Sequence, residues 1–396
     1  MAKFLLAWEL GRGSGHLVRM LPIIDELLQR GHQVYAAVKD IARAKEILPV
    51  GKIDLTRAPV LDKPIKEIQP ALTFAHVLHN VGFNDVGELR QRVNEWLHIY
   101  RQIQPDVIIF DHSPTALLAS RAIQTRRVLL GSGFFCPPDC SPLPNLRPWI
   151  KAAMPQVLAD EQRVLQLMNT ILNELQLPPL DRITQLYSEA DKTCLTTFKE
   201  LDHYRERTDA RYWGAWTKAP GGEIPQWPAV EGKKIYAYLK PFPGLSDLLA
   251  LLAELNQSTI ISCDGIDPSI QRRFQSPNIR FSNHRLDLER VGQECDLGIL
   301  NGNHGTTISL LLAGKPSFHV PITLEQAMLA DAVRRMGAGL AASFDRPAEV
   351  NQRLRRMLLT TAFQESAINF QQRYATFQPQ QSQAEMVSEI ERLAIA

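Results

Sequence analysis

The chain has 396 residues, of which 45% are hydrophobic and 22% are charged, and its formal net charge is +2, with 44 Lys and Arg against 42 Asp and Glu. These values are typical of a globular protein long enough for two domains, and they give no electrostatic reason to expect nucleic-acid binding. The five cysteines form no zinc-like pairs, which indicates a reducing compartment, and no apolar run approaches the length of a membrane span.

The first forty residues have the pattern of a strand, a helix and a second strand. Lys3–Trp8 and Gln33–Val38 predict the strands, and a glycine-rich turn at 11–15 precedes a helix with apolar periodicity. Such turns bind phosphates in dinucleotide-binding folds. Here, however, the glycine spacing differs from G-x-G-x-x-G, and Asp40 is the only acidic residue near the end of the second strand. Both departures argue against an NAD site. The candidate phosphate or loop contacts in this turn are Gly13, Ser14 and Gly15.

A buried strand at Pro105–Phe110 ends at Asp111, and Ser113 and Pro114 then begin a helix with a cap and a first-turn proline. Ligands of open α/β sheets bind at the carboxyl ends of the strands, so Asp111 is a candidate site residue. The alternative is that Asp111 is a helix-capping or loop carboxylate. Further on, the aromatic and proline-rich loop at 131–144 either suits an apolar or sugar-ring ligand or is simply a rigid loop.

The rest of the first half alternates strands and helices, with one proline-dotted variable region. The expected ranges are Asp54–Thr73 for the variable region, Val86–Gln104 and Leu165–Leu175 for helices, and Arg127–Leu130, Asp191–Thr196 and Arg211–Gly214 for strands.

Turn-forming residues and prolines at 217–232 indicate a linker. The second half then resumes with strands at Lys234–Leu239, Thr259–Cys263 and Ile279–Phe281, and with a helix at Leu245–Asn256. Alternating strands and helices predict an α/β protein with two parallel sheets. The predicted domains are residues 1–216 and 233–378, followed by a helical segment at 379–396.

The stretch 296–326 is the most informative part of the chain. A short apolar strand, Asp296–Leu300, leads through a turn with two glycines into an apolar helix, Thr306–Leu312, which stops before Gly314. Glycines let the backbone approach a ligand, and the start of the helix attracts an anion such as a diphosphate. The alternative is that the two glycines only make a tight connection.

After this helix come Ala-Gly-Lys-Pro, a strand at Ser317–Val320, and the pair Glu325-Gln326, which suits bidentate hydrogen bonds to sugar hydroxyls. The order Gly-Thr-Thr, Ala-Gly-Lys-Pro, proline-ended strand and Glu-Gln resembles the donor half of GT-B glycosyltransferases. It is most similar to the UDP-glycosyltransferase and antibiotic (macrolide, glycopeptide) glycosyltransferase group. The resemblance implies two Rossmann-like parallel-sheet domains facing a central cleft, with the segment 379–396 packing back on the first domain.

The resemblance also implies roles for single residues. His16 matches the histidine that deprotonates the acceptor, and Asp111 matches the carboxylate that orients it. Without the resemblance, His16 would be interpreted as a helix-start histidine bonded to its own loop. Glu325 and Gln326 would hold the donor sugar. The residues expected to bind the diphosphate are Gly302, Asn303, His304, Gly305, Thr306 and Thr307.

Two positions depart from the family pattern. Asn301 begins a segment that replaces the usual His-Gly-Gly, so a phosphate-contacting histidine is missing, and Asn301 or His304 would supply that contact. Lys240 and Pro241 replace a small Gly-Ser or Gly-Thr, and Lys240 either contacts a phosphate or is a solvated lysine.

The implied activity is metal-independent, inverting transfer of a sugar from a UDP- or dTDP-sugar to a hydroxyl of a small-molecule or lipid acceptor in the cytoplasm. No cofactor beyond the nucleotide-sugar is expected, and no metal site, because the sequence has no Asp-x-Asp motif. Peripheral membrane contact stays open, nucleic acid is not an expected partner, and the oligomeric state is not predicted. The alternatives are a non-catalytic sugar-nucleotide or carbohydrate binder and a sugar-nucleotide epimerase of the same fold.

Overall fold

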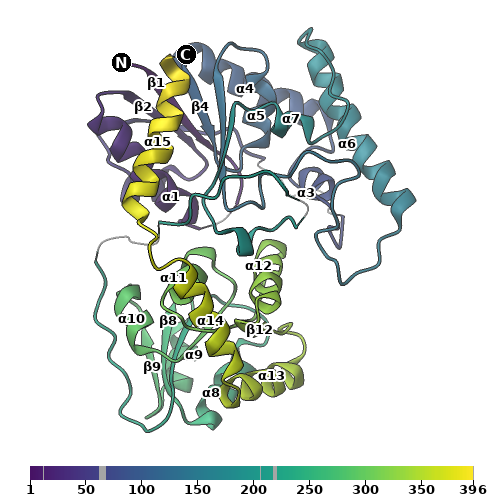
Figure 1. Ribbon diagram of the computed structural model, residues 1–396. Helices are drawn as coiled ribbons and strands as arrows, with labels where there is room; N and C mark the ends of the chain where they lie inside the picture. Colours follow the sequence, from purple (N-terminus) through teal and green to yellow (C-terminus); the bar gives the residue numbers. More distant parts are fainter. Residues whose placement is uncertain (12, 62–67, 206, 217–220, 396) are drawn as a thin grey trace. The chain divides into compact units, whose positions relative to one another are not determined.

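The chain forms two compact units in the computed structural model, which describes residues 1–11, 13–61, 68–205, 207–216 and 221–395. Unit 1 comprises Met1–Phe198, Tyr204–Trp216 and Gln378–Ala396, and unit 2 comprises Lys199–His203 and Thr217–Phe377. Each unit is built on one six-stranded sheet in which all strand pairs are parallel (Figure 1). The predicted α/β class with two parallel sheets is confirmed.

The sheet of unit 1 has the strand order β3-β2-β1-β4-β5-β6. Its strands are β1 (Lys3–Trp8), β2 (Gln33–Val38), β3 (Asp54–Arg57), β4 (Val107–Phe110), β5 (Arg126–Gly131) and β6 (Lys192–Leu195). The order reverses direction between β1 and β4, and in sheets of this kind the carboxyl ends of the strands at that switch point are where ligands bind. The register pairs Ala7 with Phe110, so the residues that follow these two strands lie side by side.

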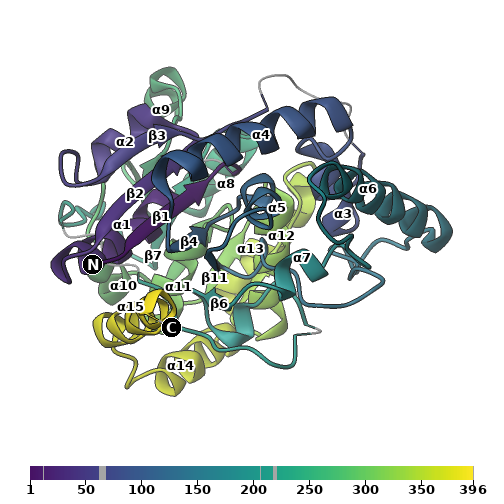
Figure 2. The same cartoon turned by 90° about the horizontal axis from the view of Figure 1, so that it is seen from above.

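Helices cover both faces of this sheet. They are α1 (Gly15–Gln29), α2 (Ile41–Ile47), α3 (Phe74–Asn80), α4 (Val86–Ile103), α5 (Pro114–Ser120), α6 (Met154–Glu174), α7 (Gln185–Ser188) and α15 (Pro379–Ile395). Successive side chains of β1 point to opposite faces. Phe4 and Leu6 join a core with α1, α2 and α15, whereas Leu5 and Ala7 join a core with α3 to α7. The view from above shows α3 and α6 side by side (Figure 2).

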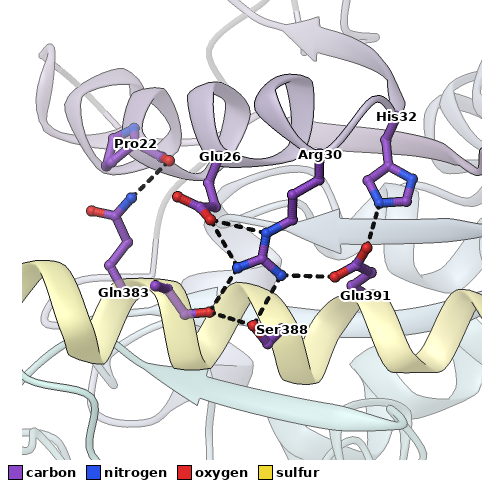
Figure 3. Close-up of polar contacts among 8 residues, drawn as sticks. Pro22, Glu26, Arg30, His32, Gln383, Ser388 and Glu391 are labelled. Carbon is purple, nitrogen blue, oxygen red and sulfur yellow. Dashed lines mark hydrogen bonds and ion pairs between the residues drawn. The ribbon is translucent and has the colours of Figure 1, made fainter.

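The last helix of the chain, α15, packs on α1 through apolar and polar contacts (Figure 3). Arg30 donates to Ser388 Oγ at 2.9 Å and to Glu391 Oε2 at 2.7 Å, and the other Glu391 oxygen lies 2.8 Å from His32 Nε2. Gln383 donates to the Pro22 carbonyl at 2.8 Å. This helix therefore completes the core of unit 1, although more than 150 residues of sequence separate it from the preceding residues of that unit.

The sheet of unit 2 has the order β12-β11-β10-β7-β8-β9, which is the topology of unit 1 repeated. The strands are β7 (Lys234–Leu239), β8 (Ser258–Cys263), β9 (Ile279–Ser282), β10 (Leu297–Leu300), β11 (Ser317–His319) and β12 (Gly339–Ala341). The helices are α8 (Leu245–Leu255), α9 (Pro268–Phe274), α10 (Leu288–Glu294), α11 (His304–Leu312), α12 (Leu324–Arg335), α13 (Pro347–Leu359) and α14 (Ala362–Arg373), and residues Lys199–Leu201 form the short 3₁₀ helix η1. The switch point of this sheet lies between β7 and β10.

Some predicted elements are wrong. Arg211–Gly214 is not a strand, because only Tyr212 pairs there, in an isolated bridge with Leu195. The region expected to be variable, Asp54–Thr73, begins with β3 at the edge of the sheet. Residues 62–67 of that region and residues 217–220 of the predicted linker lie outside the described residues. No helix in the described part of the chain combines the length and apolar character that crossing a membrane requires.

Candidate active site

The turn after β1 places His16 against the end of that strand. Gly11 and Gly13 both have positive φ angles, 91° and 87°, which glycine adopts without strain, and α1 then begins at Gly15. His16 is therefore in the first turn of α1, where it is 7% exposed and stacks on Trp8 with ring centroids 5.2 Å apart. A Cβ atom at Gly11 would overlap His16 Nε2, so the backbone lies directly against that nitrogen.

Asp111 lies beside His16, as the predicted pairing requires. His16 Nδ1 is 2.8 Å from Asp111 Oδ1, and the aspartate is fully buried. Arg19, one turn further along α1, donates from Nη1 to both Asp111 oxygens at 3.2 and 3.0 Å. Burial alone would raise the pKa of Asp111, but the charges and hydrogen bonds of His16 and Arg19 outweigh it and hold this pKa below its usual value. Asp111 is thus an ionised carboxylate rather than a helix cap.

Two aromatic rings complete the surroundings of His16. His112 has a φ of 50° and stacks on Phe135, with centroids 3.5 Å apart and planes 16° apart, and Phe135 lies 5.6 Å from the His16 ring. Burial holds the pKa of His112 well below its ordinary value, so this imidazole is neutral. Phe134 and Phe135 are only 5% and 6% exposed. The first part of the loop at 131–144 therefore packs inward instead of offering its aromatic rings to a ligand.

The start of α5 is held by Glu9 and not by the predicted cap. Ser113 occupies the N-cap position, but its side chain makes no capping hydrogen bond, while Pro114 is at the first turn as expected. Glu9 accepts from the Thr115 N–H at 2.7 Å and from Trp96 Nε1 at 2.8 Å. Burial raises the pKa of Glu9 although these hydrogen bonds oppose it. Glu9 thereby fixes the segment that carries Asp111.

Of the remaining predicted residues of this turn, Ser14 has a side chain and a local partner. Ser14 is the N-cap of α1 without a capping side-chain bond, and its hydroxyl lies 3.5 Å from Arg43 Nη1. Lys39 donates from Nζ to the Gly11 carbonyl at 2.9 Å, which ties the end of β2 to the turn. Because the first turn of α1 contains no acidic side chain, its N-terminus keeps a positive potential.

In unit 2, Asn301 joins the ends of three strands. It is fully buried, its Oδ1 accepts from the Lys240 N–H at 2.8 Å, and its Nδ2 donates to the Val320 carbonyl at 2.9 Å. The Asn301 side chain thus bridges the strand ends through its Oδ1 and one of its two Nδ2 hydrogens, and its predicted phosphate contact stays a prediction. The Lys240 ammonium lies 3.2 Å from Asp264 Oδ2, so this lysine is ion-paired rather than simply solvated.

The turn after Asn301 leads into the N-terminus of α11. Gly302 has a φ of 93°, and a Cβ there would lie 2.9 Å from both the Cβ and the carbonyl oxygen of Gln326, so the turn packs closely on the start of α12. α11 begins at His304, and Gly305 is exposed in its first turn. Asn303 Oδ1 and Thr307 Oγ1 are buried without a hydrogen-bond partner. Buried polar atoms in this state cost free energy that a bound ligand can recover.

The Glu325-Gln326 pair lies in the first turn of α12. Thr323 is the N-cap and accepts from the Gln326 N–H at 3.3 Å, while Gln326 Oε1 accepts from the Ile322 N–H at 2.9 Å. The side-chain carbonyl oxygen of Gln326 therefore helps to cap the helix, and the neighbouring Glu325 is half-buried. Within unit 2 the structure thus brings Gly302 and the Glu325-Gln326 pair together, on the same sheet edge as Lys240. No cluster of potential metal ligands occurs among residues that the structure describes.

No protein-family model and no curated protein matches the chain. Among solved structures, the calicheamicin glycosyltransferase CalG4 is similar to it with a TM-score of 0.71 and 17% identity, over 99% of this chain and 98% of that one. The spinosyn rhamnosyltransferase SpnG, complexed with spinosyn aglycone, has a TM-score of 0.69 and 16% identity, over 99% and 100%. VinC, a glycosyltransferase in complex with dTDP, has a TM-score of 0.67 and 16% identity, over 99% of each chain. The protein has the GT-B fold.

Within this GT-B chain, the predicted residues fall into two groups that the structure describes separately. His16 and Asp111 meet at the switch point of unit 1, and the turn 302–307 meets α12 in unit 2. Sequence reasoning missed Arg19, whose position three residues after His16 on one helix was the available signal. It also missed Glu9 and Phe135, for which only long-range packing supplies a partner.

Proposed function

We propose that the protein is a glycosyltransferase that moves a sugar from a nucleotide-diphosphate donor to a hydroxyl of an apolar small-molecule acceptor. The observation that carries this proposal is the His16–Asp111 contact at the carboxyl edge of the first sheet, in a chain whose fold matches natural-product glycosyltransferases over 99% of its length. A buried ionised carboxylate on one ring nitrogen is the arrangement that makes a histidine a general base.

In unit 1, Asp111 accepts the Nδ1 proton of His16, which leaves Nε2 as the basic nitrogen. Nε2 takes the proton of the acceptor hydroxyl while that oxygen bonds to the anomeric carbon of the donor sugar. The bond from this carbon to the diphosphate breaks, and the diphosphate leaves with the electron pair. Attack opposite the leaving group inverts the anomeric configuration. Asp111 stabilises the imidazolium that forms, as the carboxylate of a hydrolase triad does.

In unit 2, the leaving diphosphate would bind at the start of α11. The backbone N–H groups of the first helical turn and the helix dipole supply positive potential there, and this potential acts on charge that develops as the bond breaks. The unpartnered Thr307 hydroxyl lies in the same turn. Glu325 and Gln326 would contact the sugar, with no metal and no cofactor beyond the donor. Thymidine diphosphate is bound to SpnG and dTDP to VinC, which supports a dTDP- or UDP-sugar here.

Binding of nucleoside diphosphates tests this proposal directly. We expect one of UDP, dTDP, GDP and ADP to raise the melting temperature, with the same shift in EDTA as in Mg²⁺. A ligand at a hundred times its Kd adds about 2.7 kcal/mol, which corresponds to roughly 5 to 11 °C for units of this size, at about 2 to 4 °C per kcal/mol. If none of the four nucleotides stabilises the protein, the proposed donor site is refuted, and the proposed transfer with it. Loss of the shift in EDTA would contradict metal independence.

The acceptor side has a candidate contact surface at the start of α6. Three of the large apolar side chains that are exposed in the described residues fall within ten positions: Trp149 is 51% exposed, Met154 43% and Leu158 45%. They follow in sequence the loop at 131–144, in which Phe135 lies beside the His16 ring. We propose that these side chains, which are close in sequence, form one binding surface, because contiguous exposed apolar patches mark interaction sites. This surface would contact an apolar acceptor in place of the buried Phe134 and Phe135.

Replacing Trp149 with Ala is expected to raise the acceptor KM about tenfold, because covering an aromatic side chain on binding contributes about 1.5 kcal/mol or more. The KM of the donor and the nucleotide-dependent melting shift should not change. Val50→Ala removes another exposed apolar side chain of unit 1, 57% exposed, and serves as the matched control. An unchanged acceptor KM in Trp149→Ala would exclude this surface from acceptor binding.

A further inference from the structure

Asp111 is shared between two basic side chains from one helix. His16 and Arg19 are three residues apart on α1 and so project from the same side of it. His16 contacts one carboxylate oxygen at 2.8 Å, and Arg19 Nη1 donates to both oxygens at 3.2 and 3.0 Å. The Asp111 side chain is fully buried and that of Arg19 is 14% exposed, so these contacts are weakly screened by solvent.

Asp111 is the anion in contact with His16, and the other charged groups nearby have different partners. Glu9 is turned away toward Trp96 and the start of α5. Lys39 and Arg43 approach the turn at Gly11 and Ser14 and add positive potential. Of the titratable and charged groups around His16, Asp111 and His112 contact its ring directly, Arg19 reaches it through Asp111, Lys39 and Arg43 bond to the turn before it, and Glu9 bonds elsewhere.

We infer that Arg19 is a positioning residue that acts through Asp111: by sharing that carboxylate it weakens the attraction between Asp111 and a protonated His16, and so favours the unprotonated ring that can accept the acceptor's proton. A buried carboxylate favours the protonated form of a histidine that contacts it, and most strongly when the histidine is its only partner. Arg19 takes part of that carboxylate's interaction, and its own charge opposes a second cation nearby. General bases work best when they titrate near the working pH. This inference rests on the proposed function of His16.

The titration of His16 measures this effect without any substrate. In protein labelled at histidine Cε1, the His16 signal is assigned by its loss in His16→Ala and is followed by NMR between about pH 5 and pH 9. In Arg19→Gln, which keeps a hydrogen-bond donor but removes the charge, we expect the midpoint to rise by about one pH unit. Arg19→Lys keeps the charge and should titrate close to the unsubstituted protein. Arg101→Gln removes an exposed arginine from α4 and is the control for net charge.

Action through Asp111 is tested in a second background. In Asp111→Asn the carboxylate charge is gone, so Arg19→Gln should move the His16 midpoint much less than in the native background. An unchanged or lowered midpoint in Arg19→Gln would overturn the inference. An equal rise in both backgrounds would also overturn it, because the arginine would then act by direct repulsion alone.

Activity provides the second readout. The acid limb of the kcat/KM profile should move to higher pH in Arg19→Gln by the same amount as the NMR midpoint, with recovery of turnover at high pH. A drop in turnover that is the same at every pH would indicate a merely structural role and would contradict the inference. If no variant and no native protein transfers sugar, the proposed function fails, whereas the NMR titration still decides the role of Arg19.

Discussion

Replacing His16 with Ala is expected to lower the rate of sugar transfer by about 10² to 10⁴-fold, the usual contribution of a positioned general base. His16 Nδ1 is held by a fully buried carboxylate, and no other ring nitrogen near the first switch point has such a partner among the described residues. His112, its neighbour in the ring stack, has a pKa held well below the ordinary value by burial and packs against Phe135. We therefore expect no histidine to take over the role.

The matched measurement is nucleotide binding by the same variant. Because His16 belongs to unit 1 and the proposed diphosphate site belongs to unit 2, the melting shift with a nucleoside diphosphate should be unchanged in His16→Ala. His98→Ala, on the exposed side of α4, controls for removal of a histidine. Full transfer activity in His16→Ala would refute the base assignment. Native protein that binds nucleotide but transfers no sugar to any acceptor, even with His16 present, would favour the binding or epimerase alternatives.

Much of the fold could be predicted because parallel strands buried on both faces leave continuous apolar runs. The predicted bounds of β1, β2 and β7 equal the observed ones for this reason. The edge strand β3 is short and partly exposed, so it has no such signal and was missed. Arg211–Gly214 has the right residue types for a strand, yet only Tyr212 bridges Leu195. Propensity alone does not supply the neighbouring strand that pairing needs.

The pairing of His16 with Asp111 was predicted from the family resemblance, whereas the position of Asp111 was predictable from local patterns, since it directly follows a recognisable buried strand at the ligand-binding edge of a sheet. The role of Asn301 could not be predicted from the sequence, because its partners are backbone groups of Lys240 and Val320, which lie 61 and 19 residues away and carry no residue-specific signal. The same holds for Glu9, which caps α5 over a separation of 106 residues. Side chains that bond to distant backbone are found only in the folded chain.

The two sheets share one strand order although no sequence repeat links the halves. What the halves share is a strand, glycine turn and helix at the switch point, which is where Gly11 and Gly302 both have positive φ angles. In each half the glycine also makes a close approach that a side chain would prevent, to His16 in unit 1 and to Gln326 in unit 2. At these two turns glycine is therefore favoured for two separate reasons, conformation and space.

Replacing Gly11 with Ala is expected to reduce transfer by about 100-fold or more while leaving His16 and Asp111 in the chain. The new Cβ would overlap His16 Nε2, the nitrogen proposed to take the acceptor's proton, so the imidazole must move or lose access on that side. A displacement of about 1 Å at a catalytic group costs about 10²-fold. The positive φ of 91° adds strain for alanine, on the order of 1 to 2 kcal/mol of stability.

Gly31→Ala separates the two effects of that substitution. Gly31 has a comparable φ of 79°, but a Cβ there meets nothing within 4 Å, so the control carries the backbone strain without the overlap. We expect a loss of melting temperature in both variants, larger in Gly11→Ala because of the overlap, and a loss of turnover in Gly11→Ala only. Equal turnover in the two variants would mean that Nε2 is not the working nitrogen. The Gly11 backbone would then lie against a histidine whose only role is to pack the turn.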